Sequence, residues 1–158
     1  MGISVRVGAD AREGSEQECS RFCLARLFRG EWVRIVWDMA SAIQLKIAAF
    51  SGALAVGLGA FGAHGLKGVL ESQGTTDVWE TAVFYHFVHT LVLLWIGGRG
   101  ETLLKPWGCF LLGTTVFSGA LYVLAVTGVK WLGAVAPIGG GALIVGWLWL
   151  GVQIGRSE

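Results

Sequence analysis

The sequence predicts an all-α integral membrane protein folded as a four-helix bundle. Hydrophobic residues make up 54% of its 158 residues and charged residues only 15%, compared with roughly 25% charged residues in an average soluble domain. Beyond residue 38, four long stretches lack any Asp, Glu, Lys or Arg. Because a helix needs roughly 20 residues to cross a bilayer, these stretches predict membrane helices at residues 47–66, 81–98, 106–129 and 131–155.

The pattern within these stretches favours helices over the other membrane architecture. Only helices and closed β-barrels satisfy their backbone hydrogen bonds in lipid. Barrel strands alternate between apolar and polar residues, and the four stretches do not. The connections between them are short, which favours antiparallel neighbours in a bundle.

The first predicted helix carries small residues at four-residue spacing. Ser51, Ala55, Gly59 and Ala63 share one face, and faces of this kind let helix backbones approach closely in lipid. We therefore expect a packing face. The leading functional hypothesis is a non-enzymatic packing or accessory component that associates with itself or with a larger membrane complex.

The second predicted helix carries two histidines three residues apart, and these project from neighbouring positions on one face. Counted from residue 81, both lie in the half of the bilayer that faces outward in the orientation predicted below. Ionisable residues within a membrane segment are costly, so each raises the question of whether it serves a function. Other polar side chains converge on the same half. The predicted cluster, a speculative ligand or proton site, comprises His64, Tyr85, His86, His89 and Tyr122.

Three interpretations of this cluster stay open. The imidazoles can be neutral and bonded to hydroxyls or carbonyls, fixing helix contacts. They can serve a transporter or a proton or small-ligand carrier, or they can bind a metal or haem. No carboxylate lies inside the helices to orient the rings, so we assign no metal and no cofactor. The acidic side chains lie in connecting segments, so we assign no catalytic residue and expect no enzyme.

The third and fourth predicted helices carry further polar and backbone signals. Thr114, Ser118 and Tyr122 form a polar stripe that should turn inward or bond its own backbone. Pro137, with three glycines after it, predicts a kink or a break in the fourth helix. Trp147 and Trp149 are typical of an interfacial aromatic belt.

The first 38 residues differ from the rest, because they hold six Arg and six acidic residues. We interpret residues 1–38 as a polar extension that is either disordered or a mispredicted upstream start. Residues 39–158 are then the four-helix transmembrane domain. Cys19 and Cys23 lack further ligands nearby to complete a zinc site.

The charges also predict orientation and partners. From residue 39 on, four basic residues lie on the side of the termini and two on the other side, which places both termini in the cytoplasm. The lipid bilayer is the expected partner. The net charge of +1 provides no basic surface for nucleic acid to bind, so nucleic acid is not an expected partner.

Four motifs occur in order along residues 51–67, 79–91, 117–122 and 136–140. They are Ser51-Gly-Ala-Leu-Ala-Val-Gly-Leu-Gly-Ala-Phe-Gly-Ala-His-Gly-Leu-Lys67, Trp79-x-Thr-Ala-Val-x-Tyr-His-x-x-His-Thr-Leu91, Phe117-Ser-Gly-x-Leu-Tyr122 and Ala136-Pro-Ile-Gly-Gly140. Together they resemble the YgdD-like family of small bacterial inner-membrane proteins, a domain of unknown function. The resemblance implies a multi-pass protein of the bacterial inner (plasma) membrane, and it carries over no site residue.

Overall fold

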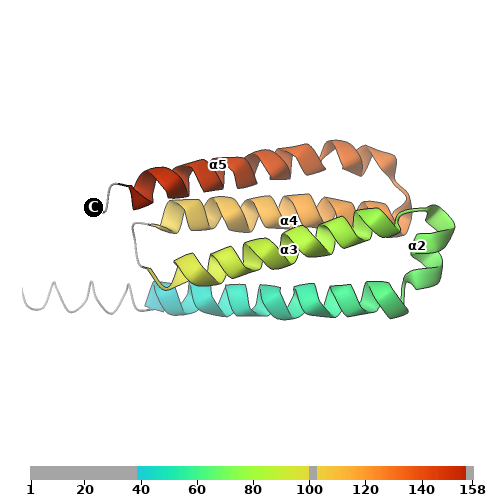
Figure 1. The fold of residues 1–158 in the computed structure, drawn as a ribbon, viewed down its shortest axis with the longest axis horizontal. Helices are drawn as coiled ribbons and strands as arrows, with labels where there is room; N and C mark the ends of the chain where they lie inside the picture. The colour runs from blue at the N-terminus through green and yellow to red at the C-terminus, as the bar shows by residue number, and fades with distance from the viewer. Residues whose placement is uncertain (1–38, 100–102, 156–158) are drawn as a thin grey trace, which may run out of the picture. The chain divides into compact units, whose positions relative to one another are not determined.

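The computed structural model describes residues 39–99 and 103–155, and every regular element in these two ranges is helical (Figure 1). Four segments are long and apolar enough to span a membrane. They are the first helix Met39–His64, α3 (Thr76–Gly97), α4 (Leu104–Thr127) and Lys130–Ile154. The last of these consists of a 3₁₀ turn, η2 (Lys130–Ala134), followed by α5 (Ala136–Ile154). The predicted all-α four-helix membrane fold is confirmed.

The short helix α2 (Lys67–Gln73) joins the first helix to α3 and defines one end of the bundle. We call this the α2 end; α5 finishes at the opposite end (Figure 1). The interpretation of residues 1–38, with Cys19 and Cys23, lies outside the described residues.

The helices extend beyond the charge-free stretches that predicted them. α3 begins at Thr76 rather than at residue 81, and it includes Asp77 in its first turn. Acidic residues there are favourable, because the amino end of a helix carries partial positive charge. α4 ends at Thr127 because Gly128 adopts a left-handed conformation with φ 70°, which glycine commonly does just after a helix.

The fourth span is interrupted near Pro137, as predicted, but the interruption lies ahead of Pro137, at Val135. Pro137 is the second residue of α5, where proline's missing N–H breaks no helical hydrogen bond. The turn η2 precedes it, so the irregular backbone lies ahead of the helix rather than within it.

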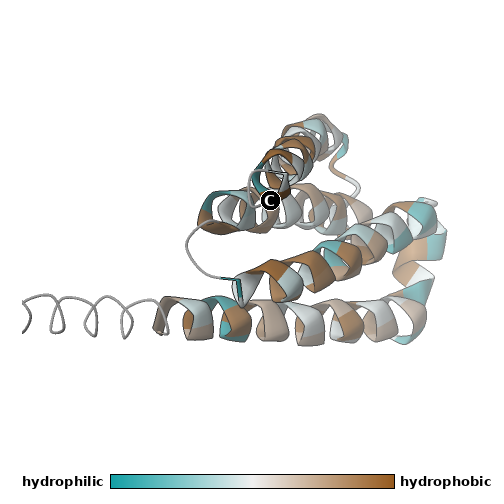
Figure 2. Ribbon diagram, turned by 60° about the vertical axis from the view of Figure 1, so that its left-hand side comes forward, coloured by the Kyte–Doolittle hydropathy of each residue, from teal (hydrophilic) through white to brown (hydrophobic). Residues whose placement is uncertain are grey.

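Apolar side chains pack along α3, α4 and α5, with α4 making the most extensive contacts to both neighbours. The core of this region comprises Leu93, Ile96, Trp107, Phe110, Leu143 and Leu150. Many large apolar side chains are also exposed, and apolar residues run along every described helix (Figure 2). Phe50, Ile138 and Leu148 are each about 70% exposed, at 72%, 70% and 68%, as expected for side chains that face lipid.

The connection at the α2 end completes the hydrogen bonding of α4. The last carbonyls of a helix have no partner within the helix. Gln73 Nε2 donates to the Val126 carbonyl at 2.7 Å, and Thr75 Oγ1 donates to the Ala125 carbonyl at 2.7 Å. Buried Leu70 and Trp79 pack against Ala125 at the same place.

Glycines allow the closest helix contacts. A Cβ at Gly62 would collide with the Trp79 indole, whose N–H donates to the Leu58 carbonyl at 3.2 Å. A Cβ at Gly139 would collide with the backbone of Phe117. The first glycine sets the spacing of the first helix and α3, and the second sets the spacing of α4 and α5.

The α4–α5 contact gives a direct test of this packing. Gly139→Ala should lower the free energy of unfolding by about 1–3 kcal/mol, because the added methyl forces the two backbones apart. Gly141→Ala is the matched control, since nothing lies within 4 Å of its added Cβ. Thermal or denaturant unfolding in detergent measures both. Equal stability of the two variants would show that Gly139 does not set the helix spacing.

Candidate functional site

Four polar side chains from three helices form one hydrogen-bonded series, which we call the His86 chain. His86 lies at its centre, with Nδ1 3.3 Å from the Tyr122 hydroxyl and Nε2 3.0 Å from Ser51 Oγ. Ser51 Oγ is in turn 2.9 Å from Thr90 Oγ1. His86 and Thr90 are buried, and Ser51 and Tyr122 are half-buried. The series therefore links the first helix, α3 and α4 through polar groups inside the bundle.

Helix geometry explains why these side chains meet. His86 and Thr90 lie one turn apart on α3 and present their polar atoms to the same neighbour. Gly52 lets the first helix approach, since a Cβ there would lie 3.2 Å from the Thr90 methyl group. Trp79 packs against Tyr122 with ring centroids 4.7 Å apart and holds the phenol beside His86.

Each member of the His86 chain can both donate and accept a hydrogen bond. In one direction, Tyr122 donates to Nδ1, Nε2–H donates to Ser51, and Ser51 donates to Thr90. In the other direction, every proton reverses and the Tyr122 hydrogen is free for another acceptor. The partners of His86 therefore do not fix its tautomer, and the chain can end at Tyr122 as a donor or as an acceptor.

His89 is held differently. Its Nδ1–H donates to the Tyr85 carbonyl at 2.8 Å, and its Nε2 accepts the Trp147 indole N–H at 3.4 Å. A carbonyl only accepts and an indole N–H only donates, so these partners fix one neutral tautomer. The rings of Tyr85 and Phe110 pack on either side, with centroids 5.7 and 5.9 Å away. His89 fixes the contact between α3 and α5.

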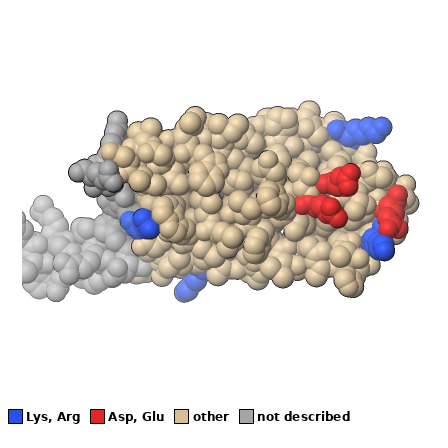
Figure 3. Space-filling view, viewed as in Figure 1, with Lys and Arg blue, Asp and Glu red and all other residues tan. Residues whose placement is uncertain are grey.

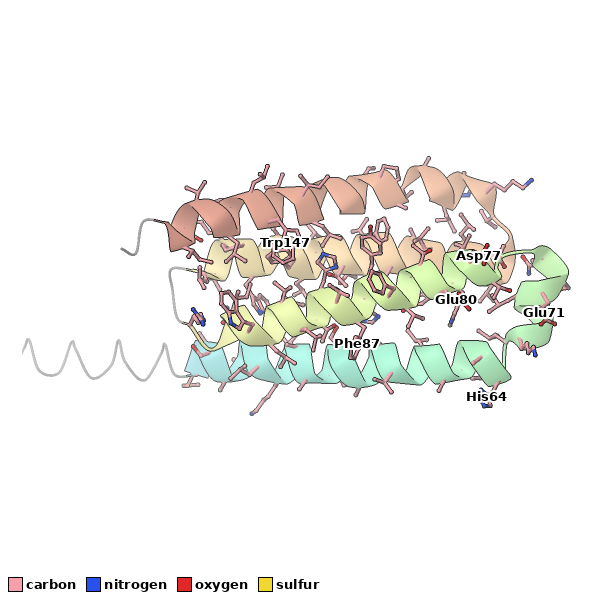
Figure 4. The ribbon with its side chains drawn as sticks, viewed as in Figure 1. His64, Glu71, Asp77, Glu80, Phe87 and Trp147 are labelled. Atoms are coloured by element: carbon pink, nitrogen blue, oxygen red, sulfur yellow. The ribbon has the colours of Figure 1, made fainter. Side chains whose placement is uncertain are left out.

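Trp147 was predicted to belong to an interfacial aromatic belt, whereas its indole N–H bonds to a side chain of α3. Its indole turns toward α3 to reach His89, and Trp147 lies nearer the carboxyl-terminal end of α5 than the α2 end (Figure 4). The sequence pattern marks a tryptophan near a helix end but does not reveal which face it occupies.

The five residues of the predicted cluster do not meet as one group. The structure joins His86 to Tyr122 and His89 to Tyr85, whereas His64 points away from the bundle at the α2 end (Figure 4). Thirteen residues separate His64 from Ser51, which places them about 140° apart around the helix. His86 also lies at the middle of α3 rather than near its start, because α3 begins earlier than predicted.

A metal site would need several ligands to converge. Among residues 39–99 and 103–155, no three His, Cys, Asp or Glu side chains come close enough to hold an ion. The separation of His64 from the other histidines is the geometric reason.

A pocket of about 290 Å³ lies beside the His86 chain, between the first helix and α4. Its walls include Leu54, Leu58 and Leu111, and its polar lining comprises Ser51, His86, Thr114, Thr115, Ser118 and Tyr122. Thr114 and Ser118 are 4% and 2% exposed, and neither hydroxyl has a hydrogen-bond partner. Unpaired buried hydroxyls are uncommon and costly.

The sequence pattern identified part of this site. The Thr114, Ser118 and Tyr122 stripe was predicted to turn inward, and it faces the pocket. Ser51 was assigned only to helix packing and Thr90 was not singled out. The four-residue spacing of His86 and Thr90 was the available signal for the latter.

Comparison with known proteins places the chain in a family. The model of "Protein of unknown function (DUF423)" matches residues 58–140. The chain belongs to the DUF423 family. This confirms the resemblance to a domain of unknown function that the sequence motifs indicated.

Named relatives of this DUF423 protein are bacterial membrane proteins. UPF0382 membrane protein YwdK of Bacillus subtilis is 42% identical over 113 residues, covering 67% of this chain and 90% of the relative. A UPF0382 membrane protein of Staphylococcus epidermidis is 48% identical over 110 residues, covering 67% and 89%. No solved structure matches the chain. The DUF423 protein is thus a small multi-spanning membrane protein whose biochemical activity is not established.

The two buried histidines of this DUF423 protein should differ in their ring protonation. Nitrogen NMR in nanodiscs at neutral pH should show His89 as one tautomer with its proton on Nδ1, and His86 as an average of two. Trp147→Phe removes the indole N–H and should shift the His89 signals, with a loss of about 0.6 kcal/mol in stability. Trp149→Phe is the control, because the Trp149 ring lies beneath the Lys105 ammonium, 5.5 Å from it. A single fixed tautomer at His86 would contradict a reversible chain.

Proposed function

We propose that the pocket beside the His86 chain binds a neutral, lipid-soluble small molecule that carries a carbonyl or hydroxyl oxygen. The protein acts as a non-enzymatic binding protein or carrier for this molecule within the membrane. The observation that carries the proposal is the pair of unpartnered hydroxyls, Thr114 and Ser118, on the lining of a largely apolar pocket. A ligand oxygen would give these groups the hydrogen bonds they lack.

The lining supports a neutral ligand. No Asp, Glu, Lys or Arg lines this pocket, and an ion placed there would be unpaired at high cost. The volume of about 290 Å³ is close to the lower end of small-molecule sites, roughly 300 Å³. These features favour a compact molecule with one or two polar atoms.

The surroundings support entry from the hydrocarbon. Phe50 and Leu54, which line the pocket on the first helix, are 72% and 46% exposed. Their exposed surfaces face lipid, so a lipid-soluble molecule reaches the pocket without crossing water. The reversible end of the His86 chain at Tyr122 serves either a carbonyl acceptor or a hydroxyl donor.

A catalytic alternative begins from the short contact between Ser51 and His86. This pair resembles a nucleophile with its base, but acyl transfer also needs donors aimed at the developing oxyanion. Ser51 lies within a continuous helix, where the backbone N–H groups are already used by helical hydrogen bonds. This arrangement supports binding rather than catalysis.

The small-residue face of the first helix, on which the packing hypothesis rests, is mostly covered by the chain itself. Ala55 is fully buried, and a Cβ at Gly59 would lie 3.3 Å from Val83 of α3. Most of the small-residue face of the first helix is therefore used within the chain, which makes it a poor docking face for a larger complex.

Photolabelling with benzophenone, a lipid-soluble aromatic ketone, tests the proposed pocket. In nanodiscs, ultraviolet light should crosslink the probe to pocket residues such as Leu54, Leu58 or Leu111, identified by mass spectrometry. Thr114→Val should weaken labelling about 2- to 10-fold, the effect of losing one buried hydrogen bond. Gly119→Phe should abolish it, because position 119 lines the pocket and has open space around an added Cβ.

Thr115→Val is the matched control for Thr114→Val. Thr115 also lines the pocket, but its hydroxyl already donates to the Leu111 carbonyl at 2.8 Å. Its replacement should leave labelling unchanged. Diphenylmethane, the hydrocarbon analogue, should compete poorly with benzophenone. Equal competition by the hydrocarbon, together with unchanged labelling of Thr114→Val, would rule out recognition of the oxygen.

We further propose that the protein lies in the bacterial inner (plasma) membrane with both termini in the cytoplasm. Lys46, Arg99 and Lys105 lie toward the end opposite α2. Arg99 lies 3.8 Å from the Trp95 ring centroid, which supports an interfacial position for both. The acidic residues of the described chain, Glu71, Asp77 and Glu80, lie toward the α2 end (Figure 4).

Cysteine labelling tests this orientation in a variant whose three native cysteines are replaced by Ser. Ser72→Cys on α2 should react with a membrane-impermeant maleimide in intact cells, because its side chain is exposed at the α2 end. Gly98→Cys at the opposite end should react only after the membrane is permeabilised. The reverse pattern would show that the termini face outward.

A further inference from the structure

A second and larger cavity, of about 560 Å³, lies at the α2 end between the first helix, α2 and α3. We call it the α2 groove. Most of its lining is apolar, including Leu70, Trp79 and Val83. Its charged side chains are Lys67, Glu71 and Glu80. No part of its lining is shared with the pocket beside the His86 chain.

We propose that the α2 groove binds a zwitterionic phospholipid whose head ends in a primary amine, such as phosphatidylethanolamine. The carboxylates would accept from the ammonium group, Lys67 would pair with the phosphate, and the acyl chain would lie along the apolar part of α3. This proposal stands independently of the ligand in the first pocket.

The order of residues along α3 supports a lipid. Glu80, Phe84, Phe87 and Val88 share one helical face, at spacings of four, seven and eight residues, and all line the groove. The face begins with a carboxylate and continues with apolar side chains over about two turns, or roughly 12 Å. Figure 4 shows Glu80 near the α2 end and Phe87 further along toward the middle. A polar head followed by a chain matches this arrangement.

The position of the α2 groove relative to the membrane also supports a phospholipid. Asp and Glu gather at the α2 end on the visible face, and a broad band without charges lies between the two ends of the described bundle (Figure 3). Phe84 and Phe87 are 64% and 41% exposed, so the groove is open where acyl chains surround the protein. The charged end therefore lies where lipid heads meet water.

The charges favour an amine head over the common alternatives. Lys67 Nζ lies 3.9 Å from Glu71 Oε1, and both side chains are largely exposed. Within residues 39–99 and 103–155, Glu80 has no ion-pair partner, which leaves excess negative charge at the groove. A primary ammonium offers three hydrogen-bond donors, whereas a trimethylammonium head offers none. A phosphoglycerol head carries no cation and would meet two carboxylates.

Native mass spectrometry can test the lipid preference of the full chain. The protein is released from nanodiscs that contain equal amounts of phosphatidylethanolamine, phosphatidylcholine and phosphatidylglycerol. The ethanolamine lipid should be retained about tenfold over each of the others. Glu80→Gln should reduce this preference severalfold, and Ala63→Trp, which places a bulky ring on the groove lining, should remove the bound lipid.

Asp77→Asn is the matched control for Glu80→Gln. Asp77 lies one turn before Glu80 and carries the same charge, but it is not part of the groove lining. Its replacement should leave the preference unchanged. Thermal unfolding with added lipid provides a second measurement, because the ethanolamine lipid should raise the midpoint of the native protein and of Asp77→Asn but not of Glu80→Gln.

Three results would overturn the proposal. The first is equal retention of the three lipids. The second is an equal loss of preference in Asp77→Asn and Glu80→Gln, which would indicate a general charge effect. The third is a dimer that persists in detergent and is disrupted by Ala63→Trp, which would assign the groove to a second copy. Benzophenone labelling of the first pocket should be unaffected by Glu80→Gln, so the two proposals fail separately.

Discussion

Polar groups inside a bilayer have no water to bind, and the organisation of this bundle depends on that constraint. Three tryptophan N–H groups find partners on neighbouring helices. Trp79 donates to the Leu58 carbonyl, Trp107 to the Leu93 carbonyl and Trp147 to the His89 ring. Each bond joins two helices through a donor that would otherwise be unsatisfied. The unpartnered hydroxyls of Thr114 and Ser118 are informative because the other polar groups around them are paired.

The contact between the first helix and α3 determines where both cavities lie. Gly52 accommodates the Thr90 methyl group and Gly62 accommodates the Trp79 indole, so the two helices pack closely at these points. Leu54 and Leu58 line the pocket toward α4, whereas Phe84 and Phe87 line the α2 groove. A single close interface therefore leaves space on both of its sides.

The sequence predicted the number and type of the membrane helices because length and apolar composition are sufficient to identify them. Their limits were less accurate, since the absence of charge does not end a helix. α3 includes Asp77 and Glu80, and extending α3 by five residues moved His86 to the middle of the helix. α4 ends just before Gly128 although the charge-free stretch continues, because Gly128 adopts a left-handed backbone conformation.

The site was predicted in part, and the errors have a common cause. Periodicity shows which residues of one helix share a face, so it placed Thr114, Ser118 and Tyr122 together. It does not show how separate helices are rotated against each other. His64 was therefore grouped with residues that it does not meet, and Trp147 was assigned to the interface instead of to His89. Ser51 was assigned to packing because its small size suits a close helix contact. The sequence pattern does not show that its hydroxyl also bonds to His86 and Thr90.

The bilayer also limits how the first pocket could distinguish the proposed ligand. A molecule dissolved in lipid gains little by moving onto leucine side chains, because acyl chains are equally apolar. Selectivity must then come from shape and from hydrogen bonds. Each interhelical hydrogen bond in a membrane contributes about 0.6 kcal/mol on average, so a few such bonds with Thr114, Ser118 and Tyr122 give modest affinity. Modest affinity means fast release, which suits a carrier better than a storage protein.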